Sequence, residues 1–462
     1  MHCLTRPSLV AVLLALTFPL TPHAQEVVRT GPPTAIRALL ESVMTAVNSA
    51  DPNVWEQFAL DRFAPELLKQ RSREERAQMF ANLRRELGTI TLDRATREGP
   101  DEPLQIKVTG STGATAIIGL AVDATTPPHI TNFTVDTGKG TTARDAGGVA
   151  APAVARSMSG DEIGRTLDAY FANLAATGEF SGVALVARDG VPVFHKAYGF
   201  SDRANKIPNT VRTRFNIGSI NKTFTQVAIN QMVRDGKLAY SDTLGKFFPD
   251  YPQATSREAT IEQLLRHTGG VADFFGPDFT RASKDQFRSN ADYFRFVGTL
   301  PATFAPGTRN QYCNGCYIAL GAIVEQASGM PYEQYVTRNI FQRAEMTSTG
   351  YVQSDAIEPD VAIGYTRRGG NDALRSNVHM HGAAGSAAGG GYSTAMDLLT
   401  YVKAVRAGRF PGAEAEMGIA GGAPGTNAVV EANGEWVVIV LTNLDPPSAE
   451  RIGVAIAEAL RR

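Results

Sequence analysis

Two side chains with complementary chemistry, Ser219 and Lys222, stand three residues apart at the start of a long apolar segment. From Ser219 onward apolar residues recur with a period near 3.6, and Gly236 ends the pattern, which predicts a helix. Residues i and i+3 lie on one face of a helix, so the lysine amine can reach the serine hydroxyl. A serine hydroxyl is a poor nucleophile until a neighbouring base takes its proton. The pair therefore predicts nucleophilic catalysis, with Ser219 as nucleophile and Lys222 as base.

The same pair also has a structural explanation. A serine that caps a helix is often followed by an exposed lysine, and this spacing occurs by chance in many long chains. The catalytic interpretation therefore depends on the elements that surround the pair.

The region from residue 159 onward predicts an antiparallel sheet with helices on both faces. A capping box, Ser159 to Glu162, opens a helix, and Asp189-Gly190 joins two strands as a strong hairpin signal. A second hairpin is predicted around Asn433-Gly434, followed by a closing helix at about 448–460. The terminal helices are expected to cover one face of the sheet, and the long helical insertion between the hairpins to cover the other.

Several short stretches of this region match a known family in order. They are Ser219-x-x-Lys222, His267-Thr268-Gly269-Gly270, Phe304-x-Pro306-Gly307-Thr308, Tyr312-Cys313-Asn314, Gly389-Gly390-Gly391-Tyr392-Ser393-Thr394 and Gly421-Gly422-Ala423-Pro424-Gly425. The set resembles the serine β-lactamase and penicillin-binding-protein superfamily, closest to its class C-like branch of lactamases, D-peptidases and esterases. Ser-x-x-Lys followed by Tyr-x-Asn is far more selective than either motif alone. The resemblance implies an α+β, β-lactamase/transpeptidase-like fold for residues 159–462.

The resemblance also implies catalytic roles for the matched residues. Ser219 would attack a carbonyl and form an acyl-enzyme, and Lys222 would take its proton once the site has lowered the pKa of the amine. Tyr312 would protonate the leaving group or activate water. Asn314 would hold Lys222 and donate to a substrate carbonyl, and a helix N-cap for residues 315–327 is its structural alternative.

The third motif departs from the family pattern. An oxyanion needs two N–H donors, which the resemblance assigns to Ser219 and to the strand with Gly421 and Gly422, with Gly422 as the donor. Where the family usually has Lys or His, this strand has Ile419, which can neither bind a substrate carboxylate nor donate a proton. His267 is expected to support a turn.

The N-terminal part predicts a separate α+β domain at 34–137. Helices are expected at 36–47, 54–68 and 72–88, the last opened by a Ser72–Glu75 capping box, and strands at 90–95, 104–109, 115–123 and 130–137. This order is similar to the curved-sheet cone of nuclear-transport-factor-like domains. No reactive side chains converge in it, which favours an accessory role. Residues 138–158, rich in Gly, Ala and Thr, are interpreted as a linker.

Composition and charge narrow the possible partners. Charged residues make up 20% of the chain and the formal net charge is −1, which gives no electrostatic reason to expect nucleic acid or an anionic membrane. Residues 1–24 have the basic start and short apolar run of a signal peptide, and no later segment is apolar enough to span a bilayer. We expect an exported protein, periplasmic or secreted.

The sequence predicts no metal or other cofactor. Cys313 and Cys316 form a C-x-x-C pair without the further ligands of a zinc site, so a local disulfide and two buried thiols both remain open. The leading interpretation is a serine hydrolase that cleaves a small ester, amide or peptide through an acyl-enzyme. A β-lactamase or D-Ala-directed peptidase is the first alternative. An acylated sensor or inactive binding protein is the second.

Overall fold

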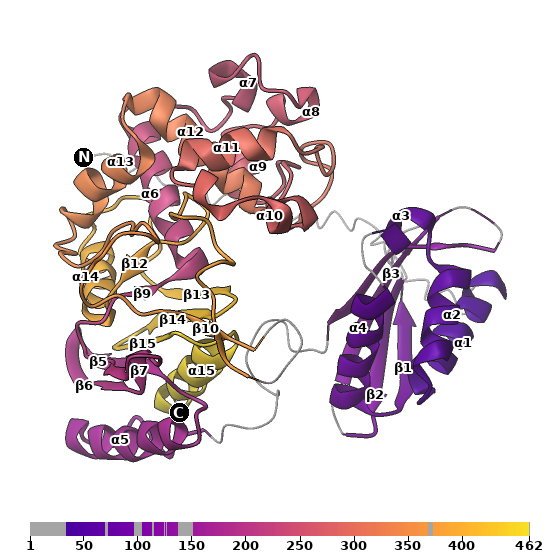
Figure 1. The fold of residues 1–462 in the computed structure, drawn as a ribbon, viewed down its shortest axis with the longest axis horizontal. Helices are drawn as coiled ribbons and strands as arrows, with labels where there is room; N and C mark the ends of the chain where they lie inside the picture. Colours follow the sequence, from indigo (N-terminus) through magenta and orange to yellow (C-terminus); the bar gives the residue numbers. More distant parts are fainter. Residues whose placement is uncertain are drawn as a thin grey trace, which may run out of the picture. The chain divides into compact units, whose positions relative to one another are not determined.

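The computed structural model describes residues 34–69, 73–96, 104–112, 115–123, 125, 127–136, 151–367 and 373–461 (Figure 1). The chain divides into two compact units, Met1–Gly138 and Lys139–Arg462. The predicted signal peptide, most of the predicted linker and the predicted cap at Ser72 lie outside the described residues. Within the described ranges, every helix is too short or too polar to cross a membrane.

The first unit combines helices with one antiparallel sheet. Its elements are α1 (Thr34–Asn48), α2 (Pro52–Arg62), α3 (Pro65–Lys69), α4 (Arg73–Leu87), β1 (Ile90–Thr96), β2 (Leu104–Gly110), β3 (Thr115–Val122) and β4 (Ile130–Asp136). The strands pair in the order β1-β2-β3-β4, which is the predicted meander. The Trp55 ring lies 5.2–5.6 Å from those of Phe58, Phe80 and Phe133 and forms the centre of the core. The similarity to a nuclear-transport-factor-like cone stays a prediction.

One predicted helix of this unit is divided in two. The expected helix at 54–68 ends at Arg62, Phe63 is extended, and α3 begins at Pro65. A proline disfavours the helical conformation of the residue before it, here Ala64, and removes a backbone donor. The single long helix was therefore a wrong prediction, although Pro65 carried the signal for the break.

The second unit is organised around a five-stranded antiparallel sheet in the order β13-β14-β15-β5-β6. Its strands are β5 (Gly182–Arg188), β6 (Val191–Tyr198), β13 (Met417–Ala423), β14 (Thr426–Asn433) and β15 (Trp436–Thr442). Asp189 and Gly190 have φ of 51° and 75°, which the tight turn between β5 and β6 requires. Both predicted hairpins are present.

Helices cover both faces of this sheet, as predicted (Figure 1). The helices α5 (Gly160–Ala176) and α15 (Ser448–Arg461) cover one face, where Phe171 and Ile452 belong to one buried cluster. The helical insertion packs on the other face. Val154 is buried in the same cluster as Phe171, so the end of the predicted linker is part of the second unit.

The insertion contains the remaining elements of the second unit. They are β7 (Phe200–Asp202), β8 (Ile207–Pro208), β9 (Phe215–Asn216), η1 (Gly218–Ile220), α6 (Asn221–Arg234), α7 (Leu244–Phe247), α8 (Ala254–Arg257), α9 (Ile261–Leu265), α10 (Pro277–Arg281), η2 (Lys284–Gln286), α11 (Asn290–Gly298), α12 (Asn314–Ser328), α13 (Tyr332–Val336), η3 (Thr337–Phe341), β10 (Tyr365–Thr366), β11 (Arg375–Ser376), β12 (Tyr392–Ser393) and α14 (Ala395–Arg406). Ser219 lies in the short 3-10 turn η1, and Lys222 lies in the first turn of α6.

Candidate active site

The turn that carries Ser219 lies against the backbone of β13. A Cβ atom at Gly421 would lie 2.0 Å from the carbonyl oxygen of Ile217 and 2.7 Å from the backbone nitrogen of Ser219. A Cβ atom at Gly218, where φ is 51°, would lie 2.7 Å from the nitrogen of Gly422. Only glycine permits this approach. The structure therefore places both predicted oxyanion residues, Gly421 and Gly422, beside Ser219.

Lys222 is buried and contacts three oxygen atoms. Its Nζ lies 3.1 Å from Ser219 Oγ and 2.8 Å from Asn314 Oδ1, and it donates to the carbonyl of Ala388. A neutral amine has two N–H groups and one lone pair. The amide oxygen and the carbonyl can only accept, so they take the two N–H groups and leave the lone pair directed at the Ser219 hydroxyl. This is the geometry that a general base requires.

The environment of Lys222 favours the uncharged amine. Burial lowers the pKa of Lys222 from 10.5 to about 7, and the charge of Asp273 opposes part of that shift. The faces of the Tyr312 and Tyr317 rings lie 4.8 and 5.5 Å from Nζ, a position that attracts a cation, so they also oppose part of the shift. At neutral pH a large fraction of the amine can therefore accept a proton. The expected lowering of the pKa is present, and its cause is burial.

Tyr312 contacts the same hydroxyl from another element. Its phenol O–H donates to Ser219 Oγ at 2.6 Å. The ring is 53% exposed, but its hydroxyl end is enclosed by the site, and this loss of water raises the pKa of Tyr312. The phenol is therefore protonated at neutral pH. It is suited to donate a proton rather than to act as a phenolate base.

Asp273 completes the site and was missed by the sequence analysis. Its Oδ2 accepts from Asn314 Nδ2 at 2.8 Å, which turns Asn314 Oδ1 toward Lys222. One N–H of the Asn314 amide therefore donates to Asp273, and only the other N–H is left to donate to a substrate carbonyl. The helix N-cap suggested for Asn314 is instead Cys313. The position of Asp273, three residues after the His-Thr-Gly-Gly stretch, was its only signal in the sequence.

His267 supports Tyr312, in keeping with the structural role predicted for it. It has a φ of 60°, its Nδ1 accepts from the N–H of Cys313 at 3.1 Å, and its ring stacks on Tyr312 at 4.8 Å. Burial and the nearby Lys222 lower the pKa of His267, so the ring is neutral. It therefore acts on the position of Tyr312 and contacts neither Ser219 nor Lys222 by a hydrogen bond.

The two cysteines lie beneath the site. Cys313 and Cys316 form a disulfide with a Cα–Cα distance of 5.3 Å, so the structure has the bonded alternative. Both are buried. The bond ties the residue between Tyr312 and Asn314 to the first turn of α12. Among the described residues, no group of His, Cys, Asp and Glu could hold a metal ion.

A cavity of about 610 Å³ opens beside Ser219 and is also lined by Asn314 and Gly422. Ile419 does not line it. This side chain lies instead on a second cavity of about 600 Å³ with Thr223 and Met417. A residue at position 419 would therefore act on the side of α6 that carries Thr223.

The comparison with known families decides the classification. The family model described as "Beta-lactamase" matches residues 167–418, more than half of the chain. The chain belongs to the β-lactamase family. This confirms the superfamily of serine hydrolases that the motifs indicated, and its α+β fold. The family match ends before Gly421, so the place of that strand comes from the structure alone.

Individual relatives are distant. The chain is 29% identical to the β-lactamase of Escherichia coli (strain K12) over 211 residues, which cover 46% of this chain and 52% of that protein. A crystal structure of a penicillin-binding protein from Bacillus halodurans superposes with a TM-score of 0.55 at 27% identity, covering 61% of this chain and 97% of that one. The chain spans about half the length of the curated relatives it matches.

Proposed function

We propose that this member of the β-lactamase family hydrolyses an ester or amide through an acyl-enzyme on Ser219. One observation carries the proposal. The Ser219 hydroxyl lies 2.6 Å from a phenol that donates to it and 3.1 Å from an amine whose pKa is lowered to about 7. A nucleophile with a base and an acid at hydrogen-bond distance is the general requirement for this chemistry.

Each step can be assigned to a residue. Lys222 takes the proton as Ser219 Oγ attacks the carbonyl carbon, and the N–H groups of Ser219 and Gly422 bind the oxyanion. Tyr312 gives its proton to the leaving group, and Lys222 then returns a proton to Tyr312. A water molecule then attacks the acyl-enzyme carbonyl and gives its proton to Lys222. Tyr312 donates a proton to Ser219 Oγ as the bond between Oγ and the acyl carbon breaks, and it regains a proton from Lys222. Ser219 is thereby regenerated.

The charges near Ser219 favour neutral substrates. The described residues that line the Ser219 cavity include no lysine or arginine. A carboxylate that enters such a site loses its water without gaining a partner. We therefore propose that esters without a carboxylate are turned over faster than β-lactams or D-Ala-D-Ala peptides, which carry one.

The second candidate is a β-lactamase or D-Ala-directed peptidase. The names of the Escherichia coli β-lactamase and the Bacillus halodurans penicillin-binding protein favour it. Measurement of kcat/KM for 4-nitrophenyl acetate, nitrocefin and a D-Ala-D-Ala peptide compares the candidates directly. Higher values for nitrocefin or the peptide would replace the first proposal by the second.

The experiment that tests the acyl-enzyme is a stopped-flow measurement with 4-nitrophenyl acetate. We expect a burst of one nitrophenolate per site, then steady turnover, with neither in Ser219→Ala. A burst without turnover would indicate the sensor alternative. No burst, no turnover and no labelling by a fluorophosphonate would refute the proposal.

We also propose that the protein acts after export. The pattern of residues 1–24 supports this, as does the disulfide between Cys313 and Cys316, since such bonds persist mainly in oxidising compartments. Fractionation of cells that produce the full chain, with mass analysis of its N-terminus, tests it.

A further inference from the structure

The cavity beside Ser219 has an apolar wall. Phe274, Phe275 and Phe279 line it together with the 352–364 segment. The three rings form one cluster, since the centroid of Phe274 lies 4.1 Å from that of Phe275 and 5.0 Å from that of Phe279. Phe274 and Phe279 are buried in the hydrophobic core, so Phe275, which is half exposed, is the ring of this cluster that a substrate can contact.

Apolar side chains around this cavity are also left exposed. Ile357 is fully exposed, and Ile207, Phe275 and Val378 expose between 42% and 51% of their surface, although all four line the cavity. Single exposed apolar residues are ordinary on protein surfaces. Four of them, from separate segments, line one cavity beside the nucleophile, and ligand cavities are typically lined by apolar side chains.

The charges around the cavity disfavour substrates that carry a carboxylate. The cavity's only carboxylates among the described lining residues are Asp202, Glu358 and Asp360, and no lysine or arginine lines the cavity with them. Glu358 pairs with Arg214 at 2.6 Å and Asp360 with Arg212 at 3.9 Å. Asp202 is hydrogen-bonded by Asn205 and forms no ion pair within the described part of the chain. A substrate carboxylate would therefore meet uncompensated negative charge at Asp202.

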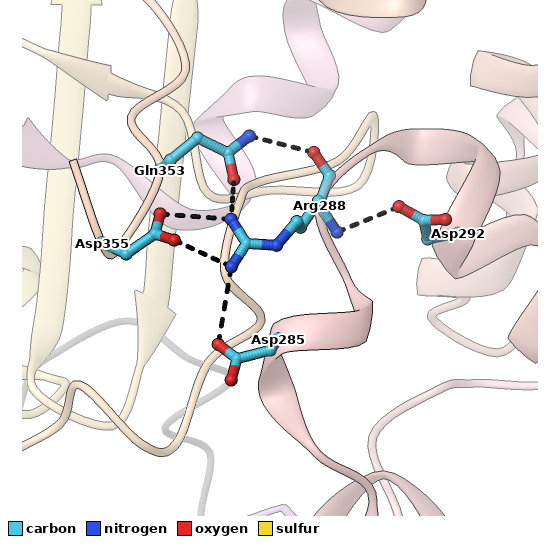
Figure 2. A network of polar contacts seen from close by, with 5 residues as sticks. All are labelled: Asp285, Arg288, Asp292, Gln353 and Asp355. Atoms are coloured by element: carbon cyan, nitrogen blue, oxygen red, sulfur yellow. Dashed lines mark hydrogen bonds and ion pairs between the residues drawn. The ribbon is translucent and has the colours of Figure 1, made fainter.

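The 352–364 segment is held by Arg288, which lies between η2 and α11. This guanidinium donates to both carboxylate oxygens of Asp355, at 3.1 and 2.8 Å, and Asp285 lies 3.7 Å away (Figure 2). Gln353 donates to the carbonyl of Arg288 at 3.1 Å. Exposed ion pairs are individually weak, but a bidentate pair within a network fixes geometry.

Arg214 attaches the same segment at a second point. Beyond its ion pair with Glu358, it donates to the carbonyl of Pro359 at 3.0 Å, and its backbone N–H donates to the carbonyl of Asp360 at 2.6 Å. Ile357 thus stands between two attachment points. The wall is formed before a substrate arrives, which lowers the entropy lost on binding.

We propose that this site accepts esters or amides that carry a bulky apolar group and no negative charge, and that Phe275 and Ile357 contact that group. The proposal rests on the acyl-enzyme chemistry proposed above and adds the substrate class. It extends the preference for neutral substrates to a preference for large apolar ones.

Two series of esters test the proposal with the full chain. We expect kcat/KM to rise at least tenfold from acetate to octanoate among 4-nitrophenyl esters, or from methyl to octyl among acetate esters of alkyl alcohols. The 4-nitrophenyl monoester of succinic acid, which ends in a carboxylate, should react at least tenfold more slowly than 4-nitrophenyl butyrate.

Substitutions locate the selectivity. We expect Ile357→Ser to lower the octanoate-to-acetate ratio of kcat/KM severalfold, and Ile357→Lys to raise the succinate-to-butyrate ratio. Ile357 is fully exposed, so both variants should fold. Val191→Ser is the matched control, because Val191 is also an exposed aliphatic residue but lies on β6 and does not line the cavity.

Equal kcat/KM along both series, or a preference for the succinate monoester, would overturn the proposal. So would an unchanged octanoate-to-acetate ratio in Ile357→Ser together with Phe275→Ser. These outcomes differ from failure of the proposed function, in which the unmodified protein would turn over none of the esters and would not be labelled by a fluorophosphonate.

Discussion

The lowered pKa of Lys222 predicts a pH dependence that can be measured. An amine with a pKa of about 7 is about one-tenth neutral at pH 6 and about nine-tenths neutral at pH 8. Because only the neutral form can accept the proton of Ser219, kcat/KM should rise about tenfold over this interval. An exposed lysine would remain charged and give no such change.

A variant assigns this rise to Lys222. The negative charge of Asp273 favours the ammonium form, so it raises the pKa of Lys222. Asp273→Asn removes the charge and keeps an oxygen that can accept from Asn314. We expect the acid limb of the profile to move to lower pH. Asp235→Asn is the control variant. It removes an exposed carboxylate outside the site, at the C-terminal end of α6, and should leave the acid limb in place.

The assay is steady-state hydrolysis of 4-nitrophenyl acetate between pH 5.5 and 9 at constant ionic strength, with nitrophenolate read at its isosbestic wavelength. This substrate does not titrate in the range, so the limb reports the free enzyme. A flat profile would refute the reasoning about Lys222. A limb that stays in place in Asp273→Asn, while it is present in the unmodified protein, would refute the electrostatic role of Asp273.

Four further predictions follow from the site and the units. Ser219→Ala should abolish labelling by a fluorophosphonate, whereas labelling of another serine would contradict the assignment. In the unfolded chain Lys222 keeps its proton up to about pH 10.5, whereas in the folded chain it keeps it only to about pH 7. The free energy of unfolding should therefore rise with pH between these two values, and urea unfolding should show no such rise in Lys222→Met. A chain that starts at residue 151 should fold and keep ester activity within a few fold; insoluble protein would contradict this. Cys313 and Cys316 should react with iodoacetamide only after reduction and unfolding, as intact mass would show.

The sequence predicted most of the fold of the second unit because its signals are local. The capping box at Ser159, the turn at Asp189-Gly190 and the hairpin at Gly434 each depend on a few neighbouring residues. The prediction of one helix at 54–68 was wrong because it relied on apolar periodicity over the whole range and ignored the local signal of Pro65.

The catalytic pair was predictable, but its surroundings were not. Ser219 and Lys222 are joined by helix geometry, which spacing reveals. Asp273 acts through Asn314, and Ala388 offers only a backbone carbonyl, so neither has a chemical signature in the sequence. The motif also could not predict that Ile419 lines the second cavity. A motif specifies the type of residue at a position and not the cavity on which its side chain lies.

The order of the strands has a consequence for biosynthesis. β15, near the C-terminus of the chain, pairs with β5, so that Ile439 lies opposite Leu185. β13, which lies beside Ser219, also comes from this C-terminal part of the chain. Contacts between residues so far apart in the chain form late and slowly. During synthesis Ser219 emerges from the ribosome long before the strand that carries Gly422. A nascent or partly exported chain would therefore hold the nucleophile without its oxyanion donor, and hydrolytic activity would appear only after the last strands have been made and have joined the sheet.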